Sequence, residues 1–115
     1  MKKLILLTIA LMPLLSFAQK AKKDIQKTSF EVEGVCGMCK NRIEKQAYSI
    51  EGVKSASWDI PTHQFSVIYD ASKTSLLNIH KQIAAVGHDT PLATSEQSTY
   101  DNLPMCCLYE RKVKE

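Results

Sequence analysis

Hydrophobic and polar residues alternate in three stretches of the chain, as they do in half-buried β-strands. In the first stretch, which begins at Thr28, Phe30 and Val32 alternate with polar neighbours. The second runs over residues 53–60 and the third over residues 63–70, with a short break between them. Two alternating runs that lie so close together predict a β-hairpin.

Two further stretches place hydrophobic residues three or four positions apart, which is the spacing of a helix with one buried face. The first helix is predicted from Cys39 to Gly52, and the second from a cap at Ser72 or Thr74 to Gly87. The predicted buried positions are Ile43, Ala47 and Ile50 in the first helix, and Leu76, Ile79, Ile83 and Val86 in the second.

A short last strand is predicted over residues 88–94, and Pro91 would confine it to an edge of the sheet. The element order is then β-α-β-β-α-β. We therefore predict an α+β fold, a ferredoxin-like βαββαβ sandwich with two helices on one four-stranded antiparallel sheet. This domain should occupy residues 28–94.

Two polar segments flank the predicted domain. Residues 19–27 are rich in lysine and predict a flexible lead-in. Residues 95–115 form a C-terminal extension that carries Cys106 and Cys107 within a short apolar cluster. An apolar cluster in a tail predicts that the tail docks onto something.

The first 18 residues have the features of a secretory signal peptide. Two lysines precede an apolar run over residues 4–15, and small residues occupy the −3 and −1 positions before a cleavage site between Ala18 and Gln19. The apolar run is too short for a membrane span, which needs about 20 residues. We expect a periplasmic or secreted protein without a membrane span after cleavage.

The predicted mature chain is short and nearly neutral. Removing 18 of 115 residues leaves 97, and the loss of two lysines lowers the net charge from +3 to +1. This length suits a single domain, and the charge argues against a nucleic-acid partner. The sequence shows no nucleophile–base pair, no paired carboxylates in a known motif and no phosphate-binding loop, so we do not expect an enzyme.

Residues 34–40 read GVCGMCK and place Cys36 and Cys39 at the start of the first predicted helix. A disulfide across so short a loop gains little closure entropy, so a structural role explains the pair poorly. The helix N-terminus and Lys40 are expected to lower the pKa of these thiols. Two thiolates on a flexible loop suit a soft ion, Cu(I) first and then Hg(II), Ag(I) and Zn(II).

Two other interpretations of the cysteines remain open. Thiol–disulfide exchange uses the same C-x-x-C spacing. The predicted antiparallel topology and the lack of a Trp or Pro next to Cys36 argue against it. The second is a disulfide-stapled module that binds no metal.

The predicted strand, the C-x-x-C loop, the helix and the segments GVKSASWDI, FSVIYD and IAAVGHD together resemble the heavy-metal-associated domain. This is the domain of copper chaperones, of the amino-terminal modules of copper-transporting ATPases and of the periplasmic mercury-binding protein. The resemblance covers residues 28–94. It implies that Cys36 and Cys39 bind a metal ion. It also implies transfer of that ion by ligand exchange to a similar domain on a metal-transporting ATPase or efflux system.

The loop departs from the family pattern. The family loop reads Gly-Met-x-Cys-x-x-Cys. Here Val35 alone separates Gly34 from Cys36, so the methionine of that pattern is absent. Met38 lies between the two cysteines instead. It either packs beneath the site or offers its thioether to the metal.

Three histidines differ in their predicted placement. His88 follows the second helix, in a loop that lies beside the metal loop in this family. It is a third metal ligand, a residue that tunes the thiolates, or a surface residue. His63 and His80 have no such placement, and we expect both on the surface.

The adjacent Cys106 and Cys107 are unlike the family core, and neighbouring cysteines rarely bridge each other. If the tail folds back over the C-x-x-C loop, four sulfurs meet in a site that suits Zn(II) or a small Cu(I) cluster. Alternatively, the tail docks through Leu103, Leu108 and Tyr109, and the two cysteines are buried as small hydrophobic residues. Disulfides of these cysteines, with Cys36 and Cys39 or elsewhere, are a further alternative, and all these interpretations are left open here.

Overall fold

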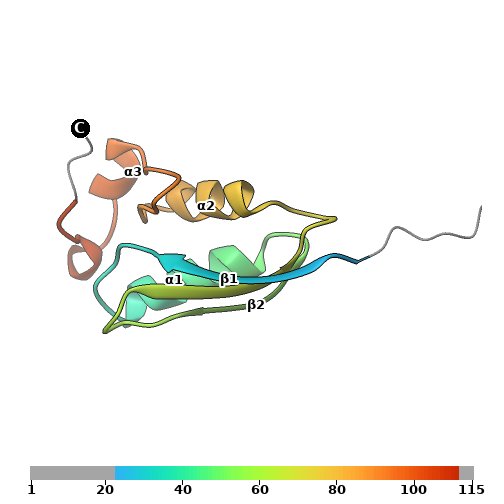
Figure 1. Cartoon of the computed structure of the whole chain (residues 1–115). Helices are drawn as coiled ribbons and strands as arrows, with labels where there is room; N and C mark the ends of the chain where they lie inside the picture. The colour runs from blue at the N-terminus through green and yellow to red at the C-terminus, as the bar shows by residue number, and fades with distance from the viewer. Residues whose placement is uncertain (1–22, 112–115) are drawn as a thin grey trace, which may run out of the picture.

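The computed structural model describes residues 23–111, so the predicted signal peptide lies outside the described residues. Within this range no helix has both the length and the apolar character needed to cross a bilayer. Figure 1 shows the order of the elements: β1 (Ile25–Glu31), α1 (Gly37–Tyr48), β2 (Val53–Trp58), β3 (Gln64–Asp70), α2 (Leu76–Ala85), α3 (Gln97–Asp101) and the 3₁₀ turn η2 (Met105–Cys107).

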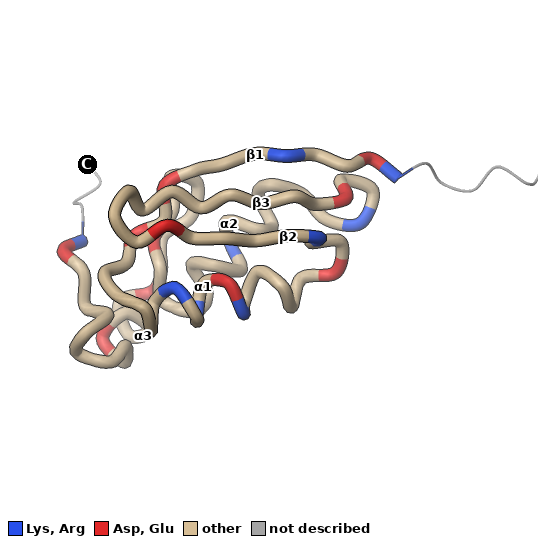
Figure 2. The backbone as a smooth tube through the Cα atoms, turned by 90° about the horizontal axis from the view of Figure 1, so that it is seen from below, with Lys and Arg blue, Asp and Glu red and all other residues tan. Residues whose placement is uncertain are grey.

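The three strands form one antiparallel sheet in the order β1-β3-β2, as Figure 2 shows. The predicted alternation is confirmed in the central strand, where Phe65, Val67 and Tyr69 are buried and Ser66 is exposed. The predicted hairpin is likewise formed, because β2 pairs with β3 from Val53 onward. Positive and negative side chains are interspersed along the chain, which fits its small net charge.

Helices α1 and α2 lie on one face of the sheet (Figure 1). Most of the positions that the helical period predicts are buried, but Leu76 and Val86 are only half-buried. Ile43 and Ile79 are both fully buried in the core between the two layers. The predicted cap of the second helix was wrong, since Ser75 Oγ accepts from the backbone N–H of Asn78 at 3.0 Å. Ser72 instead donates its hydroxyl to Asp70.

The predicted fourth strand is not formed within the described residues, so the sheet has three strands instead of four. Thr90 and Ala93 exchange backbone hydrogen bonds around Pro91 and close a turn. The backbone N–H of Glu33, two residues after β1, donates to the Asp89 carbonyl at 3.0 Å. No ladder with β1 continues beyond this bond among the described residues. Pro91 lacks an N–H, and the turn uses the polar groups that a strand would have offered to β1.

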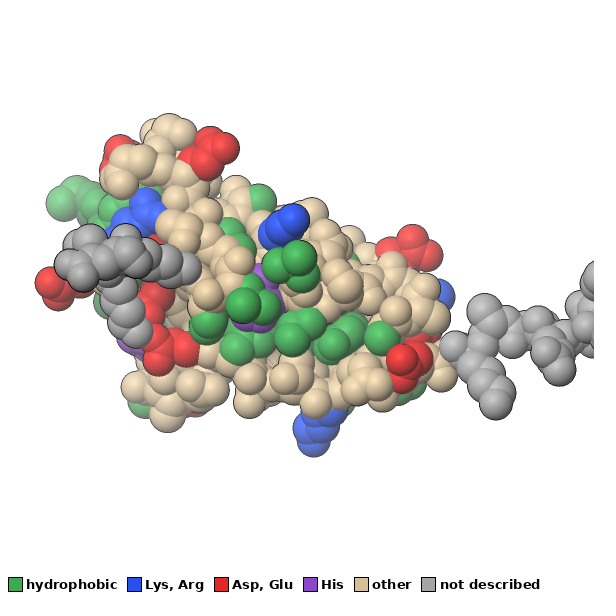
Figure 3. Space-filling model, turned by 45° about the horizontal axis from the view of Figure 1, so that its top comes forward, with side chains coloured by type: hydrophobic (Ala, Val, Ile, Leu, Met, Phe, Trp, Pro, Cys, Tyr) green, Lys and Arg blue, Asp and Glu red, His purple; other side chains and the backbone are tan. Residues whose placement is uncertain are grey.

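β1 begins earlier than predicted and includes residues 25–27 of the expected lead-in. Ile25 pairs with Asp70 and Lys27 with Ile68, because backbone pairing does not require apolar side chains. Figure 3 shows a row of hydrophobic side chains along one face of the molecule. Ile25 and Leu77 are about half exposed, which fits the missing fourth strand.

Candidate metal centre

The loop before α1 rests on Trp58. The Trp58 indole donates from Nε1 to the carbonyls of Val32 and His63, at 3.0 and 3.1 Å. A Cβ at Gly34 would lie only 2.9 Å from the Trp58 ring, so glycine is needed for this close approach. Trp58 thus fills the space beneath the loop, while Met38 is 51% exposed and does not pack there.

Cys36 and Cys39 lie at the start of α1, with their Sγ atoms 3.7 Å apart. Cys36 has an extended backbone and caps the helix, which therefore begins at Gly37 and not at Cys39 as predicted. Cys39 is fully buried in the first turn, whereas Cys36 is partly exposed. The pair therefore offers one accessible sulfur and one sulfur held in the core.

The two thiols differ in acidity. A hydrogen bond from the backbone N–H of Cys39 is the main cause that lowers the pKa of Cys36 to about 6, although partial burial opposes it. Burial raises the pKa of Cys39 to about 11. Cys36 is thus the thiolate of the pair at neutral pH, and Cys39 needs a bound cation to lose its proton.

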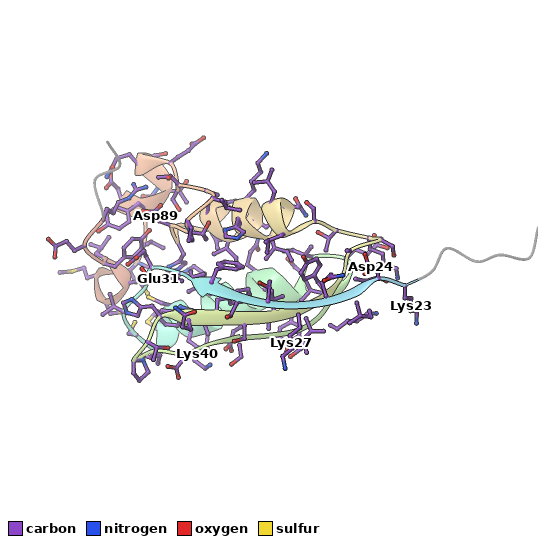
Figure 4. All side chains as sticks on the ribbon, in the orientation of Figure 1. Lys23, Asp24, Lys27, Glu31, Lys40 and Asp89 are labelled. Carbon is purple, nitrogen blue, oxygen red and sulfur yellow. The ribbon has the colours of Figure 1, made fainter. Side chains whose placement is uncertain are left out.

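Lys40 does not lower these pKa values as predicted. Its Nζ lies 2.6 Å from the Glu44 carboxylate and donates to the Trp58 carbonyl at 2.8 Å. Figure 4 shows Lys40 on the side of the sheet, away from the tail. The ammonium group is thereby held by β2 and α1 and not by the sulfurs.

The C-terminal tail brings the other two cysteines to the same place. Cys107 Sγ lies 3.7 Å from Cys36 Sγ, and the sulfurs of Cys36, Cys106 and Cys107 all lie within 4.8 Å of one another. The Cys106 thiol donates to the thioether of Met38 at 3.3 Å. All four cysteines fall within the described residues and are free thiols.

Arg42 is a site residue that sequence reasoning missed. Its Nη1 donates to Cys107 Sγ at 3.3 Å and lies 3.4 Å from Nε2 of His88. It follows Cys39 by three positions on α1, so helical spacing alone would place both on one face. The spacing could therefore have indicated that Arg42 lies near Cys39, but the sequence does not show its contact with Cys107.

His88 is neither a surface residue nor a member of the sulfur group. It is fully buried, and its Nδ1 lies 2.8 Å from the Glu33 carbonyl, to which it donates. Burial lowers its pKa to about 4, so the ring is neutral at pH 7. Its remaining nitrogen faces Arg42, which stands between His88 and Cys107.

His63 and His80 were both predicted on the surface, but they differ in burial. His80 is buried and not on the surface, because its ring stacks on Phe30 with centroids 3.8 Å apart and Nδ1 lies 2.7 Å from the Thr90 hydroxyl. His63 is half-buried and stacks on Trp58. Neither belongs to the sulfur group found among the described residues.

The tail is anchored on both sides of its cysteines, by hydrogen bonds after them and by apolar packing before them. The Tyr109 hydroxyl donates to the Gly87 carbonyl at 2.7 Å and accepts from the Asp89 N–H at 3.0 Å. Arg111 binds both carboxylate oxygens of Asp89 at 2.9 Å. Leu103 packs against Gly87, so the loop after α2 holds the tail in place.

The described residues also form a hollow of about 380 Å³ between α2 and residues 93–99. Its lining includes Lys81, Glu96 and Thr99 but none of the cysteines or histidines. A soft ion has no ligands there.

Residues 29–89, more than half of the chain, match the family model described as the heavy-metal-associated domain. The chain belongs to the heavy-metal-associated domain family. This confirms the resemblance seen in the sequence and gives the chain its coarse function, the binding of heavy-metal ions. The α+β fold agrees with that of solved relatives.

Three relatives illustrate the match. The copper chaperone CopZ of Staphylococcus aureus (strain JH9) is 39% identical over 59 residues, which cover 50% of this chain and 87% of CopZ. The copper-exporting P-type ATPase of Bacillus subtilis (strain 168) is 30% identical over 74 residues, 64% of this chain but 9% of the ATPase. The N-terminal domain of a potential copper-translocating P-type ATPase from Bacillus subtilis, solved in the Cu(I)-loaded state, has a TM-score of 0.57 at 28% identity, covering 66% of this chain and 96% of that domain.

These matches bear on the alternatives. This heavy-metal-associated domain spans only about a tenth of the ATPases, so the similarity does not extend to their transport machinery. It spans most of the copper chaperone. The thiol–disulfide interpretation is not favoured, and the sheet is antiparallel, unlike the parallel arrangement that such a redox motif accompanies.

Proposed function

We propose that the protein is an exported carrier of a soft metal ion, Cu(I) ahead of Hg(II), Ag(I) and Zn(II), which it sequesters or hands to a partner. Cys36 and Cys39 hold the ion. The observation that best supports this proposal is the geometry of the pair, since the two free sulfurs lie 3.7 Å apart at a helix N-terminus. The copper-binding relatives favour Cu(I) among the soft ions.

The difference between the two thiols supports transfer by ligand exchange. Cys36 is the more accessible and more acidic thiol, whereas Cys39 is buried. An incoming thiolate of the partner binds the ion, and Cys36 leaves as a thiolate while Cys39 still holds it. The ion keeps its oxidation state throughout. The partner fitting this exchange is a metal-transporting ATPase or efflux system that carries a similar domain.

The first test is metal content. The protein is purified anaerobically from copper-supplemented cells and copper per chain is measured by mass spectrometry. We expect at least one copper per chain, and its loss in Cys36→Ser/Cys39→Ser. Met105→Leu is the matched control, since it removes a sulfur that is 89% exposed and should keep the copper. A double mutant that retains wild-type copper would refute the proposal.

Export requires a separate test, because the predicted signal peptide lies outside the described residues. We propose cleavage between Ala18 and Gln19 and a periplasmic or secreted location. Intact-mass measurement of the protein from fractionated cells should give a chain that begins at Gln19 in the exported fraction. A chain of full length in the cytoplasmic fraction would contradict this location.

A further inference from the structure

We propose that Cys107 is a third thiolate ligand of the site, so that the C-terminal tail closes over the bound ion, while Cys106 lies beside it on the solvent side. This inference rests on the proposed function, because it adds ligands to the ion that Cys36 and Cys39 hold. The ligand class remains the soft, thiophilic ions, now those that accept three or four sulfurs. Cu(I) in trigonal coordination is the case we commit to.

The sulfur–sulfur distances favour more than two ligands. With a metal–sulfur bond of about 2.3 Å, two sulfurs lie about 4.6 Å apart in a linear site, about 4.0 Å in a trigonal one and about 3.8 Å in a tetrahedral one. Cys36 Sγ lies 3.7 Å from both Cys39 Sγ and Cys107 Sγ. These distances are close to those of a three- or four-sulfur site. A linear two-sulfur site would require the pair to separate.

Cys36 is the centre of the sulfur group. It contacts Cys39 on one side and Cys107 on the other, and Cys106 lies within 4.8 Å of it. Cys107 is fully buried, so its sulfur faces the interior, whereas Cys106 is exposed next to Met38. Cys107 is therefore the inner ligand from the tail, and Cys106 lies on the solvent side of the group.

The tail is held in this position by contacts that do not involve the cysteines. Tyr109 and Arg111 bind the loop after α2, and Leu103 is buried against Gly87. These anchors flank Cys107 on both sides in the sequence. The thiol is consequently presented to Cys36 before any ion binds, which reduces the ordering cost of a third ligand.

A cationic side chain lies next to the sulfurs and can balance the negative charge of a three-thiolate site. Three thiolates with one Cu(I) carry a net charge of −2, which is costly to bury without a nearby cation. Arg42 supplies one, because its guanidinium donates to Cys107 Sγ at 3.3 Å. The guanidinium is held there by the neutral nitrogen of His88 at 3.4 Å. Arg42 thus offsets part of the negative charge that Cys107 would carry as a metal-bound thiolate.

A tail ligand changes what the site does. A third thiolate must be displaced, in addition to Cys36, before the ion can leave. The tail therefore favours holding the ion over releasing it, and a partner has to displace Cys107 to receive it. This separates the chain from a carrier that binds through the C-x-x-C loop alone.

The test is X-ray absorption spectroscopy of the full mature protein loaded anaerobically with one equivalent of Cu(I). We expect three sulfur neighbours in the wild type and two in Cys107→Ala. Cys106→Ser is the matched control, since it removes the adjacent, exposed thiol and should keep at least three. In a chelator competition, Cys107→Ala should bind Cu(I) at least about tenfold more weakly than Cys106→Ser, a difference of about 1.4 kcal/mol.

The outcomes separate this inference from the proposed function. Two sulfur neighbours in the wild type, or equal affinities for Cys107→Ala and wild type, would overturn the inference while Cys36 and Cys39 still bind copper. A Cys36→Ser/Cys39→Ser protein that binds copper as well as wild type would instead overturn the proposed function. If Cys107→Ala fails to fold, the sulfur count of the wild type alone decides.

Discussion

Arg42 in α1 donates a hydrogen bond to the sulfur of Cys107 across 3.3 Å, although 65 residues separate the two in the sequence. The contact joins the helix that carries the C-x-x-C pair to the tail that carries the other two cysteines. It also lowers the pKa of Cys107 against the larger opposing effect of burial. In the proposed three-thiolate site, Arg42 would act on the ion through this thiol.

Replacing Arg42 by Gln should weaken Cu(I) binding while all four thiols remain. The neutral amide no longer offsets thiolate charge, and the loss of such a supporting contact typically costs about 10- to 100-fold in metal affinity. Competition with a Cu(I) chelator measures the change. Lys45→Gln is the control, because Lys45 is an exposed cation on the same helix. Equal weakening in both variants would mean that only net charge matters.

Cys36 should be the first thiol to react with iodoacetamide in the reduced, metal-free protein. Its rate should rise with pH around a midpoint near 6, since its pKa is about 6 and only the thiolate reacts. Cys39 and Cys107 should react slowly at pH 7, because burial raises the pKa of both. Tandem mass spectrometry locates the label.

Two results would contradict the assignment of Cys36 as the reactive thiolate. One is faster labelling of Cys39 than of Cys36 at pH 7. The other is an unchanged fast phase in Cys36→Ser. The exposed Cys106 is an internal reference in the same digest, since its pKa is raised, first of all by its contact with Cys36.

The metal-free protein should lose stability as the pH falls from about 6.5 to about 4. The pKa of His88 is about 4 in the folded protein and 6.5 in the unfolded chain, so the unfolded chain takes up the proton first as the pH falls. The stabilisation that the neutral, buried His88 provides is fully present above the unfolded-state pKa. It is lost as the pH falls toward the folded-state pKa, by roughly 3 kcal/mol in all. Urea unfolding at pH 7, 5.5 and 4 measures this change.

His88→Asn isolates that contribution. The asparagine amide can still donate to the Glu33 carbonyl but has no proton to gain over this range, so its stability should depend less on pH. Some dependence should remain, because burial also lowers the pKa of His80. A variant with the same pH dependence as wild type would show that His88 is not the buried group that titrates.

Much of the fold could be predicted from local pattern. The three strands and two helices follow from the spacing of residues such as Val67 and Ile79, which are buried as expected. The fourth strand could not be predicted correctly, because its fate depends on distant partners. Asp89 binds Arg111 and Tyr109 of the tail, and Thr90 closes a turn with Ala93.

The site shows the same division. Cys36 and Cys39 stand out in the sequence because three positions on a nascent helix place both thiols at one end. The burial of His88 and the contact of Arg42 with Cys107 require knowledge of which segments meet in space. The apolar cluster of the tail predicts that the tail docks, but no local signal shows onto which surface, and so the sequence left the role of Cys106 and Cys107 open.

Gly87→Ala should destabilise the protein and loosen the tail, whereas Gly37→Ala should not. Gly87 has a φ of +109°, and an added Cβ would lie 2.8 Å from Leu103 Cδ2. Backbone strain of this kind costs about 1–3 kcal/mol. Gly37 has no neighbour within 4 Å of such a Cβ and lies in a helix, which favours alanine by roughly 0.5–1 kcal/mol.

Urea unfolding of both variants measures the difference, and hydrogen exchange reports on the tail. Because Leu103 precedes the two tail cysteines, a displaced Leu103 in Gly87→Ala should also raise exchange at Cys107 and Tyr109. These amides bond within the tail at 2.8 and 2.9 Å, to Pro104 and Cys107. Equal stability and equal exchange in the two variants would show that the tail does not depend on the loop after α2.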